Sequence, residues 1–253
     1  MAYKILAYNF MMALNHVGTS GYFYLHWKNV FYPEDLPSKD YLNYYVEYFD
    51  TLELNSTFYH IPKATTVKNW RRTLPEGFVL SIKANKLITH VKRLKDTRKS
   101  IEEFTDLVLT LDEKLGVILY QLPPSLKVNL SLLEDFLSVL TKCKVKTAVE
   151  FRHRSWLSQE VFRMLKEGNV AVCISDGPGF PYTEEATADF VYIRLHGRNA
   201  LYTSEYKEEE LIKIEKMIKG FNKKRLSSYV YFNNDFEGFA VKNALTLKKL
   251  LQK

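Results

Sequence analysis

The stretch AVEFRHRSW, residues 148–156, begins as a buried strand and ends in charge. Strand side chains alternate between two faces, so Glu150 and Arg152 point to the same face. The apolar Val149 and Phe151 point to the other face. A solvent-exposed face would carry polar residues along the whole strand, whereas here they gather at its end. The pattern therefore indicates an apolar strand whose carboxyl end reaches a polar site.

Seven further segments share this apolar, β-rich character. With residues 146–153, the predicted strands are 16–22, 50–58, 77–85, 115–124, 169–176, 189–197 and 228–235. Helical periodicity predicts helices at 38–49, 100–115, 131–140, 157–168, 209–221 and 240–253. Ser38 is the predicted N-cap of the first helix, and Ser131 with Glu134 has capping-box spacing. Residues 177–188 are rich in Gly and Pro, which predicts a loop.

The alternation of strands and helices decides the predicted fold. Eight strands with helical connections in 253 residues predict a single-domain (β/α)8 barrel of the TIM type. A doubly wound open sheet is the alternative, but it would carry a GxGxxG turn after its first strand. The nearest candidate is GTSG at residues 18–21, which does not fit that pattern.

Composition and charge narrow the classes of function. The chain is 46% hydrophobic and 26% charged, which is typical of a globular domain. It holds no run of about 18 apolar residues, so we expect no membrane span. Cys143 and Cys173 lack CxxC spacing, which favours reduced thiols and a cytoplasmic protein. The net charge of +7 favours anionic partners, and nothing in the sequence indicates an oligomeric state.

Polar side chains gather at the carboxyl ends of the predicted strands, the end that forms the active-site face of a TIM barrel. Burying charge there costs several kcal/mol per ion, so stability alone would select apolar residues. The expected catalytic residues are Glu53, Glu150, Asp176 and His196. The expected substrate-binding residues are Asn55, Lys83, Gln121, Arg152, Arg194, Asn233, Asn234 and Asp235.

These residue types suit a polar ligand inside a network of opposite charges. Arg152 and Arg194 can bind a carboxylate or phosphate at two points, and we expect them to reach a common cavity. His196 can transfer a proton near neutral pH. Arg152 would keep Glu150 ionised and leave Glu53 better able to hold a proton, as a general acid and base pair requires. The alternative is that Glu150 and Arg152 only brace the barrel.

Three functions stay open from the residues. The favoured one is an enzyme of the hydrolase, lyase or isomerase type that acts on a small phosphorylated or carboxylated substrate. The second is a nucleic-acid-processing enzyme, phosphodiesterase-like and metal-assisted; the third is a non-catalytic anion-binding sensor. Five cations in residues 90–99 either form a solvated face or contact an anion or nucleic acid. We expect no cofactor, and a divalent metal ranks low because zinc favours more His or Cys and the cations would repel it.

A series of short motifs runs in order through the chain. They are VGTSGY (17–22), Trp27 with FYP (31–33), ELNSTFY (53–59), KAN and ITH (83–90), LYQLPPS (119–125), VEFRHRSW (149–156), SD (175–176), YIRLHG (192–197) and YFNND (231–235). The series resembles the domain of unknown function 72 family, also called YecE-like. The resemblance implies a TIM-type barrel over residues 16–253 but no reaction. The matching positions are Glu53, Asn55, Lys83, Gln121, Glu150, Arg152, Asp176, Arg194, His196, Asn233 and Asn234.

The amino terminus lies outside that pattern. Residues 1–15 are apolar, and we expect them to form an extension that adds little to the barrel core. A start at Met11 or Met12 would fit the family better.

Overall fold

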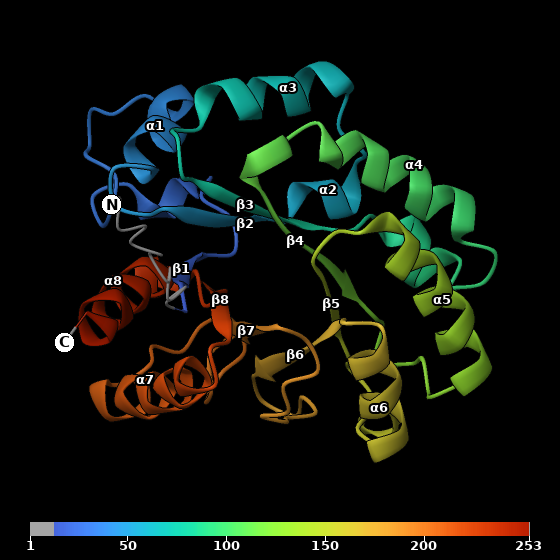
Figure 1. Ribbon diagram of the computed structural model, residues 1–253. Helices are drawn as coiled ribbons and strands as arrows, with labels where there is room; N and C mark the ends of the chain where they lie inside the picture. The colour runs from blue at the N-terminus through green and yellow to red at the C-terminus, as the bar shows by residue number, and fades with distance from the viewer. Residues whose placement is uncertain (1–12, 253) are drawn as a thin grey trace, which may run out of the picture.

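The computed structural model describes residues 13–252 and confirms the predicted (β/α)8 barrel (Figure 1). Its eight strands form one parallel sheet in the order β1-β8-β7-β6-β5-β4-β3-β2. The strands are β1 (Asn15–Thr19), β2 (Thr51–Leu54), β3 (Val79–Lys83), β4 (Leu115–Gln121), β5 (Thr147–Glu150), β6 (Ala171–Asp176), β7 (Phe190–Leu195) and β8 (Ser227–Phe232). Each lies within a segment whose apolar, β-rich composition predicted it, or within one residue of it.

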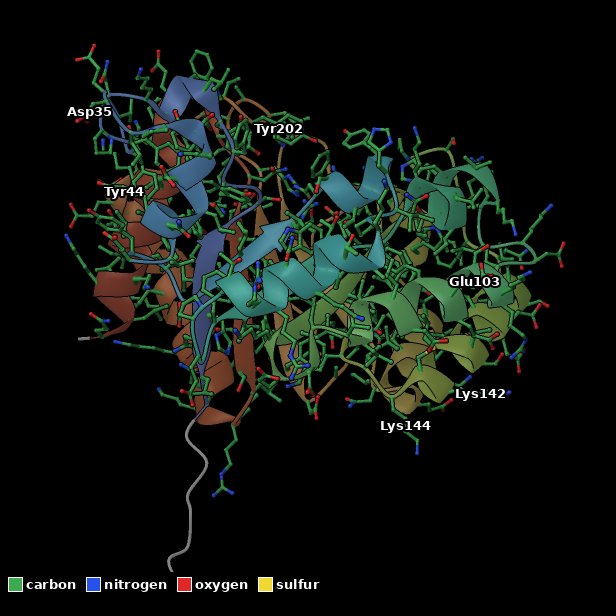
Figure 2. All side chains as sticks on the ribbon, turned by 90° about the horizontal axis from the view of Figure 1, so that it is seen from above. Asp35, Tyr44, Glu103, Lys142, Lys144 and Tyr202 are labelled. Atoms are coloured by element: carbon green, nitrogen blue, oxygen red, sulfur yellow. The ribbon has the colours of Figure 1, made fainter. Side chains whose placement is uncertain are left out.

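Helices surround the strands, and the longer ones bury apolar residues against the outer face of the sheet (Figure 1). They are α1 (Tyr41–Tyr45), α2 (Ser56–Tyr59), α3 (Ala64–Thr73), α4 (Arg98–Leu109), α5 (Leu130–Cys143), α6 (Gln159–Glu167), α7 (Glu208–Lys223) and α8 (Phe239–Leu251). Charged side chains such as Glu103 and Lys142 lie on the outside of this ring (Figure 2). The predicted loop at 177–188 holds neither helix nor strand.

Short turns of other helix types complete the connections. They are η1 (Leu25–Trp27), η2 (Ser38–Asp40), η3 (Leu87–Val91, a π-helical turn), η4 (Asp112–Lys114), η5 (Arg154–Trp156) and η6 (Phe236–Gly238). α3 was not predicted from the sequence, because Val67 is its only buried residue and so its apolar stripe is short.

Two predicted helix starts were wrong. Ser38 lies inside a 3-10 turn, and α1 begins at Tyr41. The cap of α5 is Asn129, whose side chain accepts a hydrogen bond from the Leu132 N–H at 2.9 Å. It therefore precedes Ser131 by two residues, and the capping-box interpretation of that serine does not hold.

The barrel closes between β1 and β2 with the help of a side chain. The two strands meet at the bridge between Ser20 and Glu53. Before that bridge, the Tyr45 hydroxyl accepts from the Thr19 N–H at 3.0 Å and donates to the Thr51 carbonyl at 3.1 Å. The tyrosine therefore satisfies backbone groups that would be left unpaired in a buried position.

The barrel interior is apolar in its middle layer and polar at the carboxyl ends of the strands. Inward side chains of the strands form a packed layer of Val117, Leu119, Ala148, Ala171, Cys173, Phe190, Tyr192, Tyr229 and Tyr231. Because strand side chains repeat every second residue, the same faces continue upward to the carboxyl ends. In β7, Tyr192 leads in this way to Arg194 and then to His196.

The first strand of the sheet starts at the last residue of the expected amino-terminal extension. β1 begins at Asn15, whose side-chain oxygen accepts from the Ser228 hydroxyl at 2.7 Å. The last residue of the expected extension thus belongs to the sheet, whereas residues 1–12 lie outside the described residues. Within 13–252, no helix combines the length and apolarity that crossing a bilayer requires.

Candidate functional site

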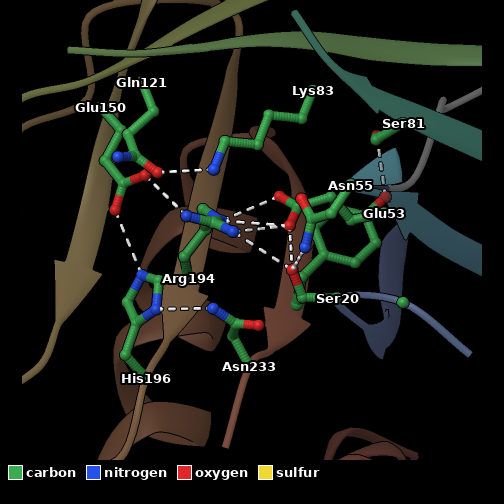
Figure 3. A network of polar contacts seen from close by, with 12 residues as sticks. Ser20, Glu53, Asn55, Ser81, Lys83, Gln121, Glu150, Arg194, His196 and Asn233 are labelled. Atoms are coloured by element: carbon green, nitrogen blue, oxygen red, sulfur yellow. Dashed lines mark hydrogen bonds and ion pairs between the residues drawn. The ribbon is translucent and has the colours of Figure 1, made fainter. Parts of the chain in front are cut away.

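A buried ionic network closes the floor of the barrel mouth, with Arg194 between two carboxylates (Figure 3). Arg194 Nε and Nη2 donate to the two oxygens of Glu53 at 2.9 and 2.8 Å. Arg194 Nη1 donates to Glu150 Oε2 at 2.6 Å. At most 1% of each of the three side chains is exposed to solvent. The structure thus brings together three of the predicted site residues, from the ends of β2, β5 and β7.

The same two carboxylates accept further hydrogen bonds from other groups. Glu53 accepts from the hydroxyls of Tyr192, at 2.7 Å, and Ser20. Glu150 Oε1 accepts from the Ser175 hydroxyl and from Arg152 Nη2, each at 2.7 Å. The floor is a fully hydrogen-bonded structure of the kind that a buried charge requires.

Both carboxylates are ionised in this environment. Burial alone would raise the pKa of Glu53, but Arg194 and the hydrogen bonds outweigh it and lower that pKa. Burial acts in the same way on Glu150, and Arg152 with Arg194 takes its pKa well below the usual range. The predicted asymmetry, in which Glu53 keeps a proton, is therefore wrong.

Arg194 was predicted to bind an anion beside Arg152, and its geometry contradicts that role. Its Nη2 donates to Ser20 in addition to Glu53, and Glu53 and Glu150 occupy the rest of the guanidinium. A buried guanidinium with every side occupied cannot also hold a ligand at two points.

His196 is buried next to the network. Burial, followed by the positive charge of Arg194, lowers the pKa of His196 to about 4, so the ring is neutral at pH 7. The Asn233 amide lies 3.0 Å from Nδ1, which assigns the ring hydrogen to Nε2. Nε2 lies 3.1 Å from Glu150 Oε1 and donates to it. With both nitrogens engaged, the ring orients its neighbours rather than transferring a proton freely.

A rim of partly exposed polar residues stands above this floor, formed by Asn55, Lys83, Gln121, Arg152 and Asn233. Lys83 Nζ donates to Gln121 Oε1 at 2.7 Å and lies 4.2 Å from the centre of the Phe58 ring. Burial, followed by the charge of Arg194, lowers the pKa of Lys83 to about 8. Lys83 is therefore the mouth residue with a pKa near neutrality.

In the described part of the chain, two rim atoms are buried without a hydrogen-bond partner, namely Arg152 Nε and Asn55 Oδ1. The Arg152 guanidinium stacks on the Phe180 ring, 3.6 Å from its centre. Floor and rim together hold two carboxylates, two guanidiniums and one ammonium, so the mouth carries one net positive charge. An unpaired donor in a positive mouth is complementary to an anion.

Three predicted site residues lie away from the mouth. Asp176 pairs in register with Leu195, so it points outward, where Arg198 donates to it at 2.8 and 3.1 Å. The Asn234 amide donates to the Ser204 carbonyl and the Asn243 side chain, each at 2.9 Å.

The third is Asp235, which faces the opposite loop. Its carbonyl accepts from Trp27 Nε1 at 2.8 Å, and its carboxylate lies 3.6 Å from His26 Nε2. The alternation of side chains places Asp176 and Asn234 outside the mouth, whereas Asp235 lies beyond the end of β8 and is held by the Trp27 loop.

Sequence reasoning missed three hydroxyls of the floor, Ser20, Ser175 and Tyr192. Tyr192 lies two residues before Arg194 and shares its face, a signal that could have been read. Ser175 pairs in register with Arg194, so it is the inward residue of β6 where Asp176 was expected.

The basic segment at 90–99 is bound largely within the protein. Arg93 donates to the Ser125 hydroxyl and carbonyl at 2.9 and 3.0 Å. Arg98 and Lys99 form i,i+4 pairs with acidic residues of α4. These contacts fit the solvated-face interpretation better than a nucleic-acid contact.

The described part of the chain offers no group of three or more His, Cys, Asp or Glu side chains that could hold a metal ion. The two floor carboxylates are occupied by guanidiniums and hydroxyls, as shown above for Glu53 and Glu150.

The chain is similar to known proteins in sequence and in structure. The family described as "Protein of unknown function DUF72" matches residues 16–253. The UPF0759 protein YunF of Bacillus subtilis (strain 168) is 27% identical, over 87% of this chain and 89% of its own. The crystal structure of a DUF72 family protein from Thermotoga maritima is 34% identical with a TM-score of 0.85, covering 95% of this chain and all of its own. A DUF72 family protein from Enterococcus faecalis, 20% identical, has a TM-score of 0.80 and covers 95% of this chain and 96% of its own.

Proposed function

The chain belongs to the DUF72 family of proteins of unknown function, and from that premise we propose that it is an enzyme acting on a small anionic substrate at its barrel mouth. The substrate carries a carboxylate or a phosphate, and the reaction is acid/base chemistry of the hydrolase, lyase or isomerase type. The position supports this proposal, because TIM-barrel enzymes place their active sites at the carboxyl ends of the strands.

One observation carries the proposal: among the described residues 13–252, no carboxylate pairs with the amine of Lys83, which lies above a floor whose own charges are satisfied. Its hydrogen-bond acceptor is the amide oxygen of Gln121. With a pKa of about 8, Lys83 exchanges a proton close to neutral pH, as a general acid or base must. Perturbed groups of this kind cluster at functional sites.

Arg152 is the residue from which we infer that the substrate is anionic. Its guanidinium is held by Glu150 through Nη2 and by the Phe180 ring, which fixes its plane. Its Nε is buried and has no partner in the described structure. A carboxylate or phosphate oxygen at this position would accept from Nε, and Lys83 would add a second positive charge.

The test measures the binding of inorganic phosphate and of pyruvate to the full chain by titration calorimetry. We expect Arg152→Gln to weaken binding at least about tenfold, because a hydrogen bond to a charged group contributes about 1.5–3 kcal/mol. Arg154→Gln is the matched control, since Arg154 is an exposed neighbour on the same connection. An equal loss in both variants, or no binding by the parent protein, would contradict the proposal.

A non-catalytic anion-binding sensor is the second candidate. The saturation of both carboxylates and of His196 favours it, since these groups have little freedom to take part in a reaction. For a nucleic-acid-processing enzyme, the pairing of the 90–99 cations removes the main support. Because Cys143 and Cys173 are free thiols, we infer a cytoplasmic setting.

A further inference from the structure

We propose that Lys83 is a nucleophile that forms a covalent imine with the aldehyde or ketone group of a small anionic substrate. The inference rests on the proposed function and names both the substrate class and the reactive atom. The substrate is a carbonyl compound with a carboxylate or phosphate at its other end, and the reactive atom is Lys83 Nζ.

The amine of Lys83 has no carboxylate partner in the described part of the chain. A lysine that only stabilises a buried network would be expected to pair with a carboxylate. Both floor carboxylates are instead occupied by Arg194, and Glu150 also by Arg152. Within residues 13–252 no carboxylate lies at ion-pair distance from Lys83 Nζ, and its hydrogen-bond acceptor, the Gln121 amide oxygen, cannot take up its proton. The amine is thus held in place without being held as an ammonium.

The surroundings of the amine favour its neutral form. Its nitrogen is packed beside the Phe58 ring, and burial together with the guanidinium of Arg194 disfavours the ammonium more than Glu150 and Glu53 stabilise it. A pKa of about 8, against an ordinary 10.5, leaves roughly a tenth of the amine neutral at pH 7. Desolvation and a neighbouring cation are the two devices that activate nucleophilic lysines.

Each step of imine formation can be followed at the mouth. The neutral amine attacks the carbonyl carbon, and one proton passes from the nitrogen to the carbonyl oxygen to give a carbinolamine. That hydroxyl leaves with a second proton as water while the nitrogen lone pair forms the C=N bond. One amine, one carbonyl and one net proton thus give an iminium ion and water. Arg152 would hold the anionic end of the substrate, and the partly open rim lets the water leave.

The experiment traps the imine by reduction. The full chain is incubated with pyruvate, glyoxylate or glyceraldehyde 3-phosphate and sodium cyanoborohydride, and the labelled lysine is located by peptide mass spectrometry. We expect Lys83 to gain one reduced adduct, at least about tenfold faster than exposed lysines. Labelling should saturate with the carbonyl compound and be slowed by inorganic phosphate.

The matched control is Lys86, three residues further along the chain. It is exposed and also faces an aromatic ring, with Nζ 5.8 Å from the centre of Tyr59. Lys83→Met should abolish the fast labelling and Lys86→Met should leave it unchanged; thermal unfolding checks that both variants are folded. The phosphate competition needs no variant and tests the same site in the parent protein.

The outcomes separate this inference from the proposed function. If phosphate or pyruvate binds in calorimetry but Lys83 is labelled no faster than Lys86 by any of the three compounds, the imine is wrong and the anion site stands. If nothing binds and nothing is labelled, both proposals fail. Fast labelling at Lys83 that phosphate does not slow would also contradict the inference, because the amine would then react outside the anion site.

Discussion

Arg194 and Glu53 face each other in the closed floor of the barrel, joined by hydrogen bonds of 2.8 and 2.9 Å across 141 residues of sequence. Neither side chain is more than 1% exposed. Because the pair is buried, each charge depends on the other for compensation. We therefore infer that the floor is a structural platform, and the proposed function assigns the ligand chemistry to the rim above it.

Removing the charge of Glu53 should destabilise the fold. Glu53→Gln keeps the shape but leaves Arg194 with one carboxylate fewer, and we expect a loss of about 3–5 kcal/mol in the free energy of unfolding. Urea denaturation measures it. Glu103→Gln is the control, because that residue is 67% exposed in its i,i+4 pair with Lys99 and should change stability by less than about 0.5 kcal/mol. Equal effects in the two variants would show that the floor is not the platform inferred here.

The same carboxylates predict a stability that falls in acid. Their pKa values are lowered in the folded protein, so their contribution is complete above the unfolded pKa of about 4.5. It is lost as the pH falls below that value, because the unfolded state then binds protons more readily. We expect thermal midpoints to fall below pH 4.5, and to fall less steeply in Glu53→Gln. A parent and a variant with parallel pH profiles would argue against ionised floor carboxylates.

The closure between β1 and β2 depends on one hydroxyl. Tyr45→Phe leaves the Thr19 N–H and the Thr51 carbonyl unpaired in a buried place, which should cost about 1–3 kcal/mol. Gly18 packs so close that an added Cβ would lie 2.4 Å from the Thr51 carbonyl oxygen, leaving little room for water. Tyr44→Phe is the control on the same helix, where the hydroxyl is exposed (Figure 2). Chemical denaturation measures the free energy of unfolding of both variants. A Tyr45→Phe variant as stable as the parent protein would mean that water replaces the hydroxyl.

Asp176 should be dispensable for anion binding. It was expected in the mouth, but it lies on the outer face of β6 with Arg198. Asp176→Asn should therefore leave the affinity for phosphate within about twofold of the parent protein, the range expected for a residue that does not touch the ligand. Calorimetry measures this beside Arg152→Gln. A tenfold change in the Asp176 variant would place the anion site on the outer side of β6.

The strands could be predicted from the sequence, but the direction of the side chains at their ends could not. The eight strands were visible because buried parallel strands are apolar runs bounded by polar ends. The face of each end residue was harder to predict: β6 ends in Ser175 and then Asp176, and only the pairing of Ser175 with Arg194 shows which one points inward. A carboxylate attracts a catalytic interpretation, whereas the serine next to it is the residue that contacts Glu150.

A single sequence also cannot show which partners a side chain contacts. Arg194 was correctly expected at a strand end, but its partners come from strands far apart in sequence. Whether a guanidinium is free to bind a ligand depends on those partners and not on its own position. The role of Tyr45 in closing the barrel could not be predicted either, because in the sequence it is one of several aromatic residues in a helical segment.

Replacing Lys83 should make the protein more stable at neutral pH while it removes the reactive amine. The folded state disfavours the ammonium, since the pKa falls to about 8 from 10.5. Below pH 8 the Lys83 ammonium of the folded parent protein is desolvated, whereas in the unfolded chain it is solvated. Between pH 8 and 10.5 the folded protein has lost this charge, so the stability of the parent protein rises relative to the variant. Functional groups are often held at a cost to stability in this way.

We expect Lys83→Met to raise the free energy of unfolding at pH 7 by about 0.5–1 kcal/mol, with the Gln121 amide hydrated by solvent because it is partly exposed. The difference from the parent protein should shrink between pH 8 and 10.5, as the parent amine loses its proton. Thermal unfolding of both proteins at pH 7 and 9.5 measures this, and Lys86→Met, which alters an exposed lysine, should show no such trend. If Lys83→Met is less stable than the parent protein at pH 7, the ammonium braces the mouth, and its role as a reactive amine loses its energetic basis.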